Sequence, residues 1–183
     1  MLRLPAFADC ADTSTVSASV KVDRISDPSR ASALASLLES VIGRPERWDV
    51  RGWIEQAQAR GILLAAFRGR EPVGFLGARR VAEIEIRESD ETAFCYSLRP
   101  DYVYVVPDAR RTGIAAALRD VLVDCCRKDL AILADMREAM SDAGLELEIE
   151  VLSFVESDEG EEFVERTRQK LEEVASELCF GME

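Results

Sequence analysis

Histidine is absent from this chain of 183 residues. Without an imidazole, the chain cannot form a Ser-His-Asp triad or a Cys-His pair, which excludes those routes of nucleophilic catalysis. None of its five cysteines follows a C-x-x-C spacing, so a zinc site is not expected. We interpret the cysteines as reduced thiols of a cytoplasmic protein. A run of apolar residues long enough to cross a membrane is also absent.

Positive charge is scarce: 23 lysines and arginines face 35 aspartates and glutamates, giving a net charge of −12. A surface of this sign repels phosphate backbones, which disfavours nucleic acid as a partner. It would attract cationic partners such as amines or basic peptides, although many soluble proteins are acidic without binding anything cationic. The apolar fraction of 48% predicts a folded chain. We expect a flexible tail over residues 1–14 and one domain over 15–183.

The first half of the chain alternates between strand and helix signals. Residues 15–26 alternate between apolar and polar side chains, which predicts a first strand. Asp27 before Pro28 is a typical helix start, and Asp49 predicts the start of a second helix that ends at Gly61.

Three strands are expected next, over residues 62–68, 72–87 and 92–106. Short polar turns separate them, so we predict an antiparallel meander. Pro100 is expected to interrupt the last of these strands or to form a bulge in it.

The remaining elements are helical except for one strand. Apolar residues at helical spacing predict a helix from Gly113 and a separate helical segment over residues 129–143. A strand over 145–151 and a helix over 160–178 follow. The fold class is therefore α+β: a mixed, mainly antiparallel sheet flanked by helices, with an extra helix before the fifth strand and a short C-terminus.

One stretch joins a strand, a turn and a helix start: Tyr102-Val-Tyr-Val-Val-Pro-Asp-Ala-Arg-Arg-Thr-Gly-Ile-Ala115. A β-rich run ends at a proline, two arginines follow, and Gly113 opens an amphipathic helix. The free N–H groups and partial positive charge of a helix N-terminus suit a phosphate group. The alternative is an ordinary strand-to-helix turn in which Gly113 serves only close packing.

The Arg110–Ala115 run resembles the Arg/Gln-x-x-Gly-x-Gly/Ala signature of the GNAT superfamily of N-acetyltransferases, and the predicted order of elements is similar over residues 15–178. The resemblance implies acetyl-CoA as co-substrate and direct attack by a primary amine on its thioester. It also implies two groups of cofactor-binding residues. The backbone of Tyr104, Val105 and Val106 would hold the pantetheine arm, and the pyrophosphate would contact Arg110, Arg111, Thr112, Gly113, Ile114 and Ala115.

The usual catalytic side chains of that family have no counterpart here. Many relatives use a tyrosine early in the helix that corresponds to residues 160–178 as the acid that protonates the departing thiolate. This chain has no tyrosine after Tyr104. In some relatives a glutamate of the fourth strand acts as the general base, and Arg99 occupies that place in this chain. Glu150 and Ser153, on and after the strand over 145–151, are the candidate substitutes for proton transfer through water. The alternative for Glu150 is a solvated sheet face.

The sequence thus predicts an acetyl-CoA-dependent N-acetyltransferase for a small or protein-borne amine, with a cationic acceptor as one option. The alternative is a catalytically weak or inactive GNAT-like module that acts through protein contacts. The far edge of the sheet is bare, covered by the extra helix, or completed by a second subunit in a homodimer.

Overall fold

The computed structural model describes residues 13–17, 20–42, 49–86, 92–139, 146–152 and 157–179 of the chain. Six strands are hydrogen-bonded in the order β1-β2-β3-β4-β5-β6. The pairs β1–β2, β2–β3 and β3–β4 are antiparallel, whereas β5 and β6 are parallel. The predicted fold class, a mixed and mainly antiparallel sheet with flanking helices, is confirmed. No helix among the described residues is long and apolar enough to span a bilayer.

The chain divides into two compact units. The N-terminal unit comprises Ala11–Arg79 and Pro100–Leu122, and the C-terminal unit includes Arg80–Arg99 and Val123–Glu183. Strands β4 (Glu71–Ile86) and β5 (Thr92–Val105) and helix α3 (Ile114–Ala139) each contribute residues to both. Each unit is described separately below.

The N-terminal unit begins with a hairpin that the sequence pattern did not predict. The single strand expected over residues 15–26 is wrong: β1 (Thr13–Ser17) and β2 (Val20–Arg24) are two antiparallel strands. Thr13 and Ser14 therefore belong to β1 and not to the predicted tail, whose residues 1–12 lie outside the described part. Alternation continues through both strands, so periodicity alone could not reveal the reversal between them.

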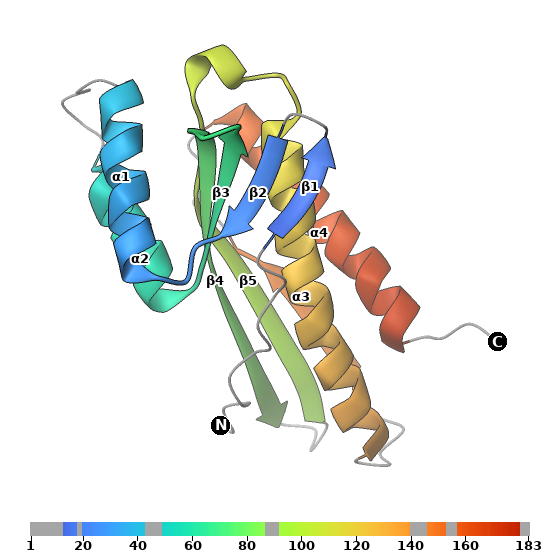
Figure 1. Cartoon of the computed structure of the whole chain (residues 1–183). Helices are drawn as coiled ribbons and strands as arrows, with labels where there is room; N and C mark the ends of the chain where they lie inside the picture. Colours follow the sequence, from blue (N-terminus) through green and yellow to red (C-terminus); the bar gives the residue numbers. More distant parts are fainter. Residues whose placement is uncertain are drawn as a thin grey trace. The chain divides into compact units, whose positions relative to one another are not determined.

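Two helices follow, each at its predicted start. Helix α1 (Pro28–Ile42) begins after Asp27, which accepts hydrogen bonds from the backbone N–H and hydroxyl of Ser29. Helix α2 (Val50–Arg60) begins after Asp49, whose carboxylate accepts the Gly52 N–H at 2.8 Å. Both carboxylates satisfy a donor that the helix itself leaves unpaired. The two helices lie side by side (Figure 1).

Two glycines of β4 let helices approach the sheet from opposite faces. A Cβ on Gly77 would lie 2.7 Å from the Cβ of Ala57 in α2. A Cβ on Gly74 would lie 3.3 Å from Ile114 Cγ2, at the start of α3. Because successive side chains of a strand alternate, these positions face opposite ways. Strand β3 (Ile62–Arg68) pairs with β4 here, and its apolar side chains are almost entirely buried.

Helix α3 is one continuous helix of 26 residues, and the prediction of a separate segment over 129–143 is wrong. The prediction places the start of that segment at Asp129. Instead, the Asp129 side chain is fully buried in the C-terminal unit, where its Oδ2 lies 2.6 Å from Arg80 Nη1 and accepts the Tyr96 hydroxyl at 2.8 Å. Residues 140–143 lie outside the described part.

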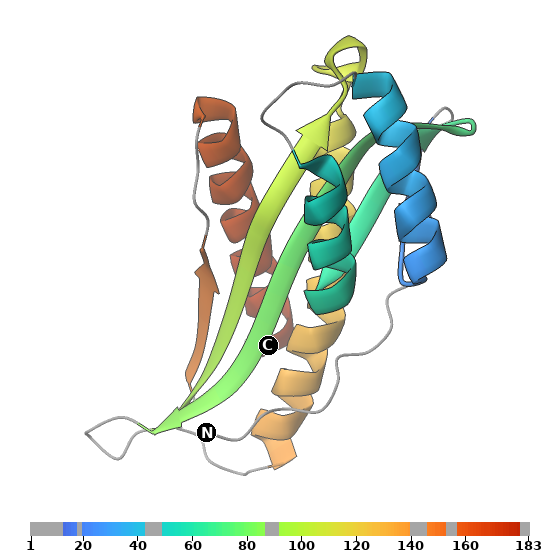
Figure 2. The ribbon, with the colours of Figure 1, turned by 90° about the vertical axis from the view of Figure 1, so that its left-hand side faces the viewer.

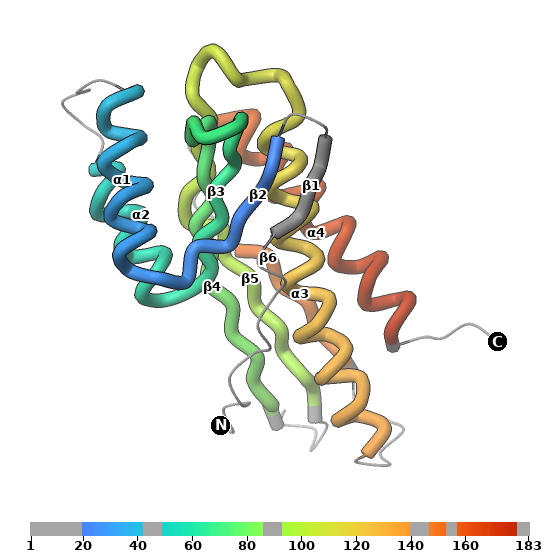
Figure 3. The backbone as a smooth tube through the Cα atoms, viewed as in Figure 1, coloured from blue at the N-terminus to red at the C-terminus, as the bar shows by residue number. Residues whose placement is uncertain are grey.

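The C-terminal unit also contains β6 (Glu146–Val151) and α4 (Asp158–Cys179), both close to their predicted bounds. Figure 3 labels β6, which packs against α4. The buried face of α4 is apolar apart from Thr167, whose hydroxyl donates to the Phe163 carbonyl. Helix α4 is also tied to α3 by an ion pair between Arg127 and Glu177.

Candidate functional site

The candidate site lies in the N-terminal unit, where β5 passes into α3. The chain leaves β5 at Val105, makes one 3-10 turn over Pro107–Ala109, and enters α3 at Ile114. The proline restricts the backbone and ends the strand. We call residues Arg110–Ala115 the cradle loop; they correspond to the signature run of the sequence.

The backbone of the cradle loop twice enters the left-handed region. Arg111 has a φ of 60° and Gly113 a φ of 85°. A Cβ on Gly113 would meet no atom within 4 Å, so close packing does not explain this glycine. The alternative reading of Gly113 as a packing residue is therefore wrong. The glycine is needed for its backbone conformation, and it leaves the space above the turn open to a ligand.

The start of α3 is anchored while its preceding loop is exposed. Ile114 is 2% exposed and lies against Gly74 of β4. The first intrahelical bond runs from the Ala117 N–H to the Gly113 carbonyl. The N–H groups of the first turn have no acceptor within the helix, and they carry the positive end of its dipole. Arg110 to Gly113 are all exposed around this terminus. The arrangement suits a phosphate-containing ligand.

The end of β5 carries the other predicted contacts. The Val106 N–H donates to the Val73 carbonyl of β4, and the Val106 carbonyl accepts the Ala109 N–H. Both backbone groups of Val106 are thus engaged within the chain. Because backbone groups alternate in direction along a strand, those of Tyr104 also point toward β4. The predicted contacts through Tyr104 and Val106 are therefore not open.

Val103 and Val105 have the opposite backbone direction, away from β4. The Val105 carbonyl accepts a hydrogen bond from Arg110 Nε at 3.1 Å, which confirms that it is directed outward. Val103 was missed by the sequence analysis. Its position two residues before Val105 was the available signal, since residues two apart direct their backbone groups to the same side.

The side chain of Tyr104 is buried within the N-terminal unit. Its ring is 7% exposed and lies 6.1 Å from the ring of Phe75, centroid to centroid. Burial raises the pKa of the Tyr104 hydroxyl, and the nearby Arg110 partly offsets this. The hydroxyl therefore stays protonated at neutral pH.

We infer a bulge in β5 just before this stretch from two contacts with β4. Gly77 and Arg79 are two residues apart in β4 and so face the same way. Gly77 faces the Tyr102 ring, while Arg79 binds the neighbouring Asp101 through two hydrogen bonds of 2.6 and 2.8 Å. Two consecutive residues of β5 thus meet the same face of β4, as in a β-bulge. Pro100 does not interrupt β5, which is one strand over Thr92–Val105, and the inferred bulge lies next to this proline.

The bulge also turns Tyr102 toward α2. Its ring stacks on that of Trp53 with a centroid distance of 4.9 Å and an interplanar angle of 15°. Offset stacking of aromatic rings adds to the energy of burying them. The stack and the Arg79–Asp101 pair together hold the segment of β5 that leads to Val103 and Val105.

The described residues include one of the two predicted catalytic residues. Glu150 is an exposed residue of β6 in the C-terminal unit, and its Oε2 accepts the Ser97 hydroxyl at 3.4 Å. Ser153 lies outside the described residues. Within the described ranges, no group of three acidic or cysteine side chains is arranged to hold a metal ion.

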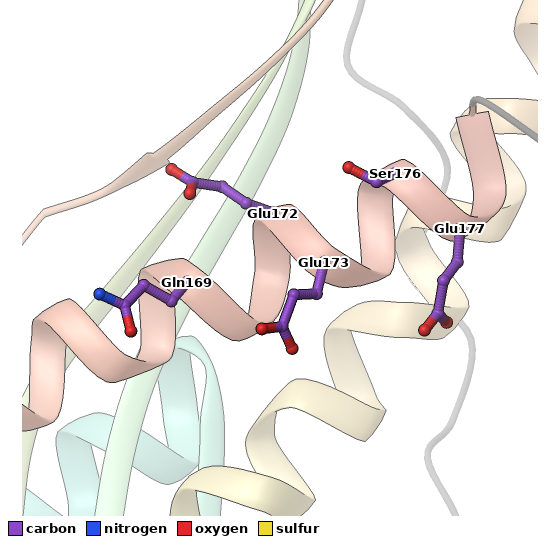
Figure 4. Close-up of a pocket in the computed structure, with 5 residues that line it drawn as sticks. All are labelled: Gln169, Glu172, Glu173, Ser176 and Glu177. Carbon is purple, nitrogen blue, oxygen red and sulfur yellow. The ribbon is translucent and has the colours of Figure 1, made fainter.

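A shallow hollow of about 550 Å³ lies on the exposed side of α4. Five polar side chains line it, three of them glutamates: Gln169, Glu172, Glu173, Ser176 and Glu177. Figure 4 shows that they project from the helix in different directions and do not converge on a point. We assign no site to this hollow.

These features define an α+β protein whose strand–loop–helix segment has a geometry that suits a phosphate group. The sequence profile described as the acetyltransferase (GNAT) family matches residues 31–140, which is more than half of the chain. The chain belongs to the GNAT acetyltransferase family. A comparison with curated protein sequences found no match.

Solved structures of acetyltransferases are similar to this chain at low sequence identity. A ribosomal-protein-alanine N-acetyltransferase from Brucella melitensis biovar Abortus 2308 is 23% identical, with 80% of this chain and 89% of that chain covered and a TM-score of 0.42. A predicted acetyltransferase with acetyl-CoA from Clostridium acetobutylicum is 14% identical over 80% and 87%, with a TM-score of 0.45. An aminoglycoside acetyltransferase from an uncultured soil metagenomic sample, in complex with sisomicin, is 14% identical over 81% and 87%, with a TM-score of 0.39.

Proposed function

We propose that this protein is an N-acetyltransferase that transfers an acetyl group from acetyl-CoA to a primary amine of a small molecule or a protein. The observation that carries the proposal is the cradle loop. Two exposed arginines and a glycine with a φ of 85° surround an anchored helix N-terminus. Family membership supports the acyltransferase class.

The residues present fit a coenzyme A moiety. The side chains of Arg110, Arg111 and Thr112 and the N–H groups from Gly113 to Ala115 would hold the pyrophosphate. The outward backbone groups of Val103 and Val105 would bind the amides of the pantetheine arm, as an added strand does. Bound acetyl-CoA would supply the acetyl group of its thioester to the acceptor amine, and coenzyme A would leave as the free thiol.

Arg110 would have two partners in turn. Its Nε donates to the Val105 carbonyl. If the pantetheine arm bonded to that carbonyl, the Arg110 guanidinium would be free to bind the pyrophosphate. Exchange of one partner for another keeps the Val105 carbonyl hydrogen-bonded in both states.

Glu150 and Ser153 remain our candidates for proton transfer from the acceptor ammonium. Asp101 is a weaker candidate, because both of its carboxylate oxygens already bind Arg79. An acidic chain of net charge −12 favours a cationic acceptor. The cytoplasmic location, the homodimer and the exclusion of nucleic acid and membranes stay predictions.

Calorimetric titration with acetyl-CoA, and with coenzyme A alongside, tests the proposal. We expect both to bind the wild-type protein, and the double variant Arg110→Ala/Arg111→Ala to bind them about tenfold or more weakly, because charge-assisted contacts to phosphate are lost. Arg70→Ala is the matched control, since Arg70 is an exposed arginine in the β3–β4 turn. Unchanged affinity in the double variant would refute the assigned cradle.

A second candidate function is a GNAT-like binding module without turnover. It is favoured by the sequence of α4, since residues 158–179 contain no tyrosine to act as a general acid. A screen of amine acceptors with release of free thiol as the readout separates the two functions. Acetyl-CoA binding without thiol release over a broad amine panel would select the module.

A further inference from the structure

Among the described residues of the C-terminal unit, no strand lies beyond β6 in the sheet order. Strand β6 is the last strand in the sheet order and, among the described residues, pairs only with β5. Figure 2 shows β6 as the orange strand at the margin of the sheet, with α4 beside it. An open edge presents backbone donors and acceptors that another extended chain can bind.

The direction of these backbone groups follows from one hydrogen bond. The Leu152 N–H donates to the Leu98 carbonyl of β5 at 2.9 Å. Since backbone direction alternates along an extended chain, Glu148 and Glu150 also direct their backbone groups toward β5. Leu147, Ile149 and Val151 therefore direct theirs toward the open edge.

The side chains along this edge divide by charge. Glu148 and Glu150 lie on the face that carries Cys95 and Ser97 of β5, because Glu148 Oε2 lies 3.7 Å from the Cys95 sulfur and Glu150 accepts the Ser97 hydroxyl. On the other face, the three apolar residues are half-buried. A strand added at this edge would thus meet carboxylates on one face and apolar side chains on the other.

The negative potential of the acidic face acts on its neighbours. Burial raises the pKa of the Cys95 thiol to about 11, and the charges of Glu85 and Glu148 contribute to that increase. Glu85 belongs to β4, so the negative potential extends across three strands of the face. Together, the carboxylates of Glu85, Glu148 and Glu150 favour a cationic side chain on any strand added beside β6.

The homodimer predicted from the sequence would place a second copy of β6 at this edge, which the charge of the strand disfavours. Pairing two Leu-Glu-Leu-Glu-Ile-Glu-Val segments would place glutamates beside glutamates on the same face, and like charges directly opposite each other are destabilising. A strand with lysine or arginine at every second position would instead match each carboxylate with a cation.

We propose that the β6 edge binds an extended basic segment of a partner protein as an added strand. The segment alternates cationic and apolar residues, with its cations beside Glu148 and Glu150. Its backbone bonds to the outward groups of Leu147, Ile149 and Val151. This interaction does not depend on acetyl transfer.

A capped, fluorescently labelled peptide of alternating lysine and valine is the probe, and fluorescence polarisation is the readout. We expect binding to the full chain that Ile149→Pro weakens about tenfold, because proline removes an outward N–H and leaves the bonds to β5 in place. Ile149→Ala is the matched control, since it shortens the side chain and keeps the N–H. Glu148→Gln/Glu150→Gln should weaken binding and reduce its salt dependence.

Hydrogen exchange provides a measurement that does not rely on a variant. Added peptide should slow the exchange of the amides of Leu147, Ile149 and Val151 in the wild-type chain. If Ile149→Pro binds the peptide as tightly as the wild-type chain does, the proposal is overturned. Binding would then come only from electrostatic attraction between the basic peptide and an acidic surface. Absence of binding, or a dimer that Ile149→Pro dissociates, would overturn it as well.

Discussion

Arg110 Nε donates a hydrogen bond to the Val105 carbonyl across the turn that joins β5 to α3, with a donor–acceptor distance of 3.1 Å. The bond lets the arginine occupy the acceptor that we assign to the pantetheine arm. It links the two halves of the proposed cofactor site. Ligands that use one or both halves should therefore respond differently to loss of this side chain.

The first prediction compares coenzyme A with 3′-phospho-ADP, which lacks the pantetheine arm. Arg110→Ala should weaken 3′-phospho-ADP more than coenzyme A, because only coenzyme A gains from the freed Val105 carbonyl. Arg111→Ala should weaken both ligands equally, since Arg111 lies beyond that carbonyl. Calorimetry measures the two affinities for each variant, and an equal loss in Arg110→Ala would contradict the exchange.

The second prediction separates conformation from ligand binding at Gly113. Gly113→Ala and Gly69→Ala both place a side chain on a backbone with positive φ and open space around it. Each should lower the free energy of unfolding by about 1 kcal/mol. Only Gly113→Ala should also weaken coenzyme A, because its methyl group enters the cradle. Equal coenzyme A affinity in the two variants would argue against a phosphate at this turn.

The third prediction concerns the pair that holds the bulge of β5. Asp101→Asn should cost about 1 kcal/mol of stability, since Arg79 loses a bidentate carboxylate partner on a half-exposed surface. A double-mutant cycle with Arg79→Gln measures the coupling between the two residues by chemical denaturation. We expect the double variant to be less destabilised than the sum of the single ones. Additive losses would mean that the pair does not act as a unit.

The fourth prediction uses the pKa of Cys95. A thiolate is the reactive form of cysteine, so a pKa of about 11 keeps Cys95 protonated and slow to alkylate at pH 8. Its alkylation rate should keep rising as the pH increases from 9 toward 11. Glu148→Gln removes one of the charges that raise the pKa and should speed the reaction at pH 8. Mass spectrometry of the peptide that carries Cys95 measures the rate, and a plateau below pH 9 would disprove the shift.

Much of the fold could be predicted because local chemistry determines where its helices begin. Asp27, Asp49 and Gly113 each mark a helix start through a cap or a backbone conformation that short-range sequence encodes. The continuity of α3 could not be predicted in this way. From the sequence alone, Asp129 is expected on the surface. In the structure it is a buried carboxylate, and its contacts with Arg80 and Tyr96 explain why it can lie inside the protein.

The candidate site shows the same division between local and non-local information. The arginines and glycine of the cradle loop were visible as a motif. The backbone contacts of β5 were assigned to three successive residues, although a strand directs only every second residue to one side. The direction depends on the Val106–Val73 bond to β4, which is a tertiary contact and leaves no trace in the local sequence.

Arg111 combines a bulky side chain with a φ of 60°. A left-handed backbone costs a residue other than glycine about 1 kcal/mol. Replacement by glycine would relieve that strain, so Arg111→Gly should be a stabilising substitution that nonetheless removes a cation from the cradle. At this position the residue that favours stability therefore differs from the residue that favours cofactor binding. Directed selection for heat tolerance alone should accumulate substitutions of Arg111.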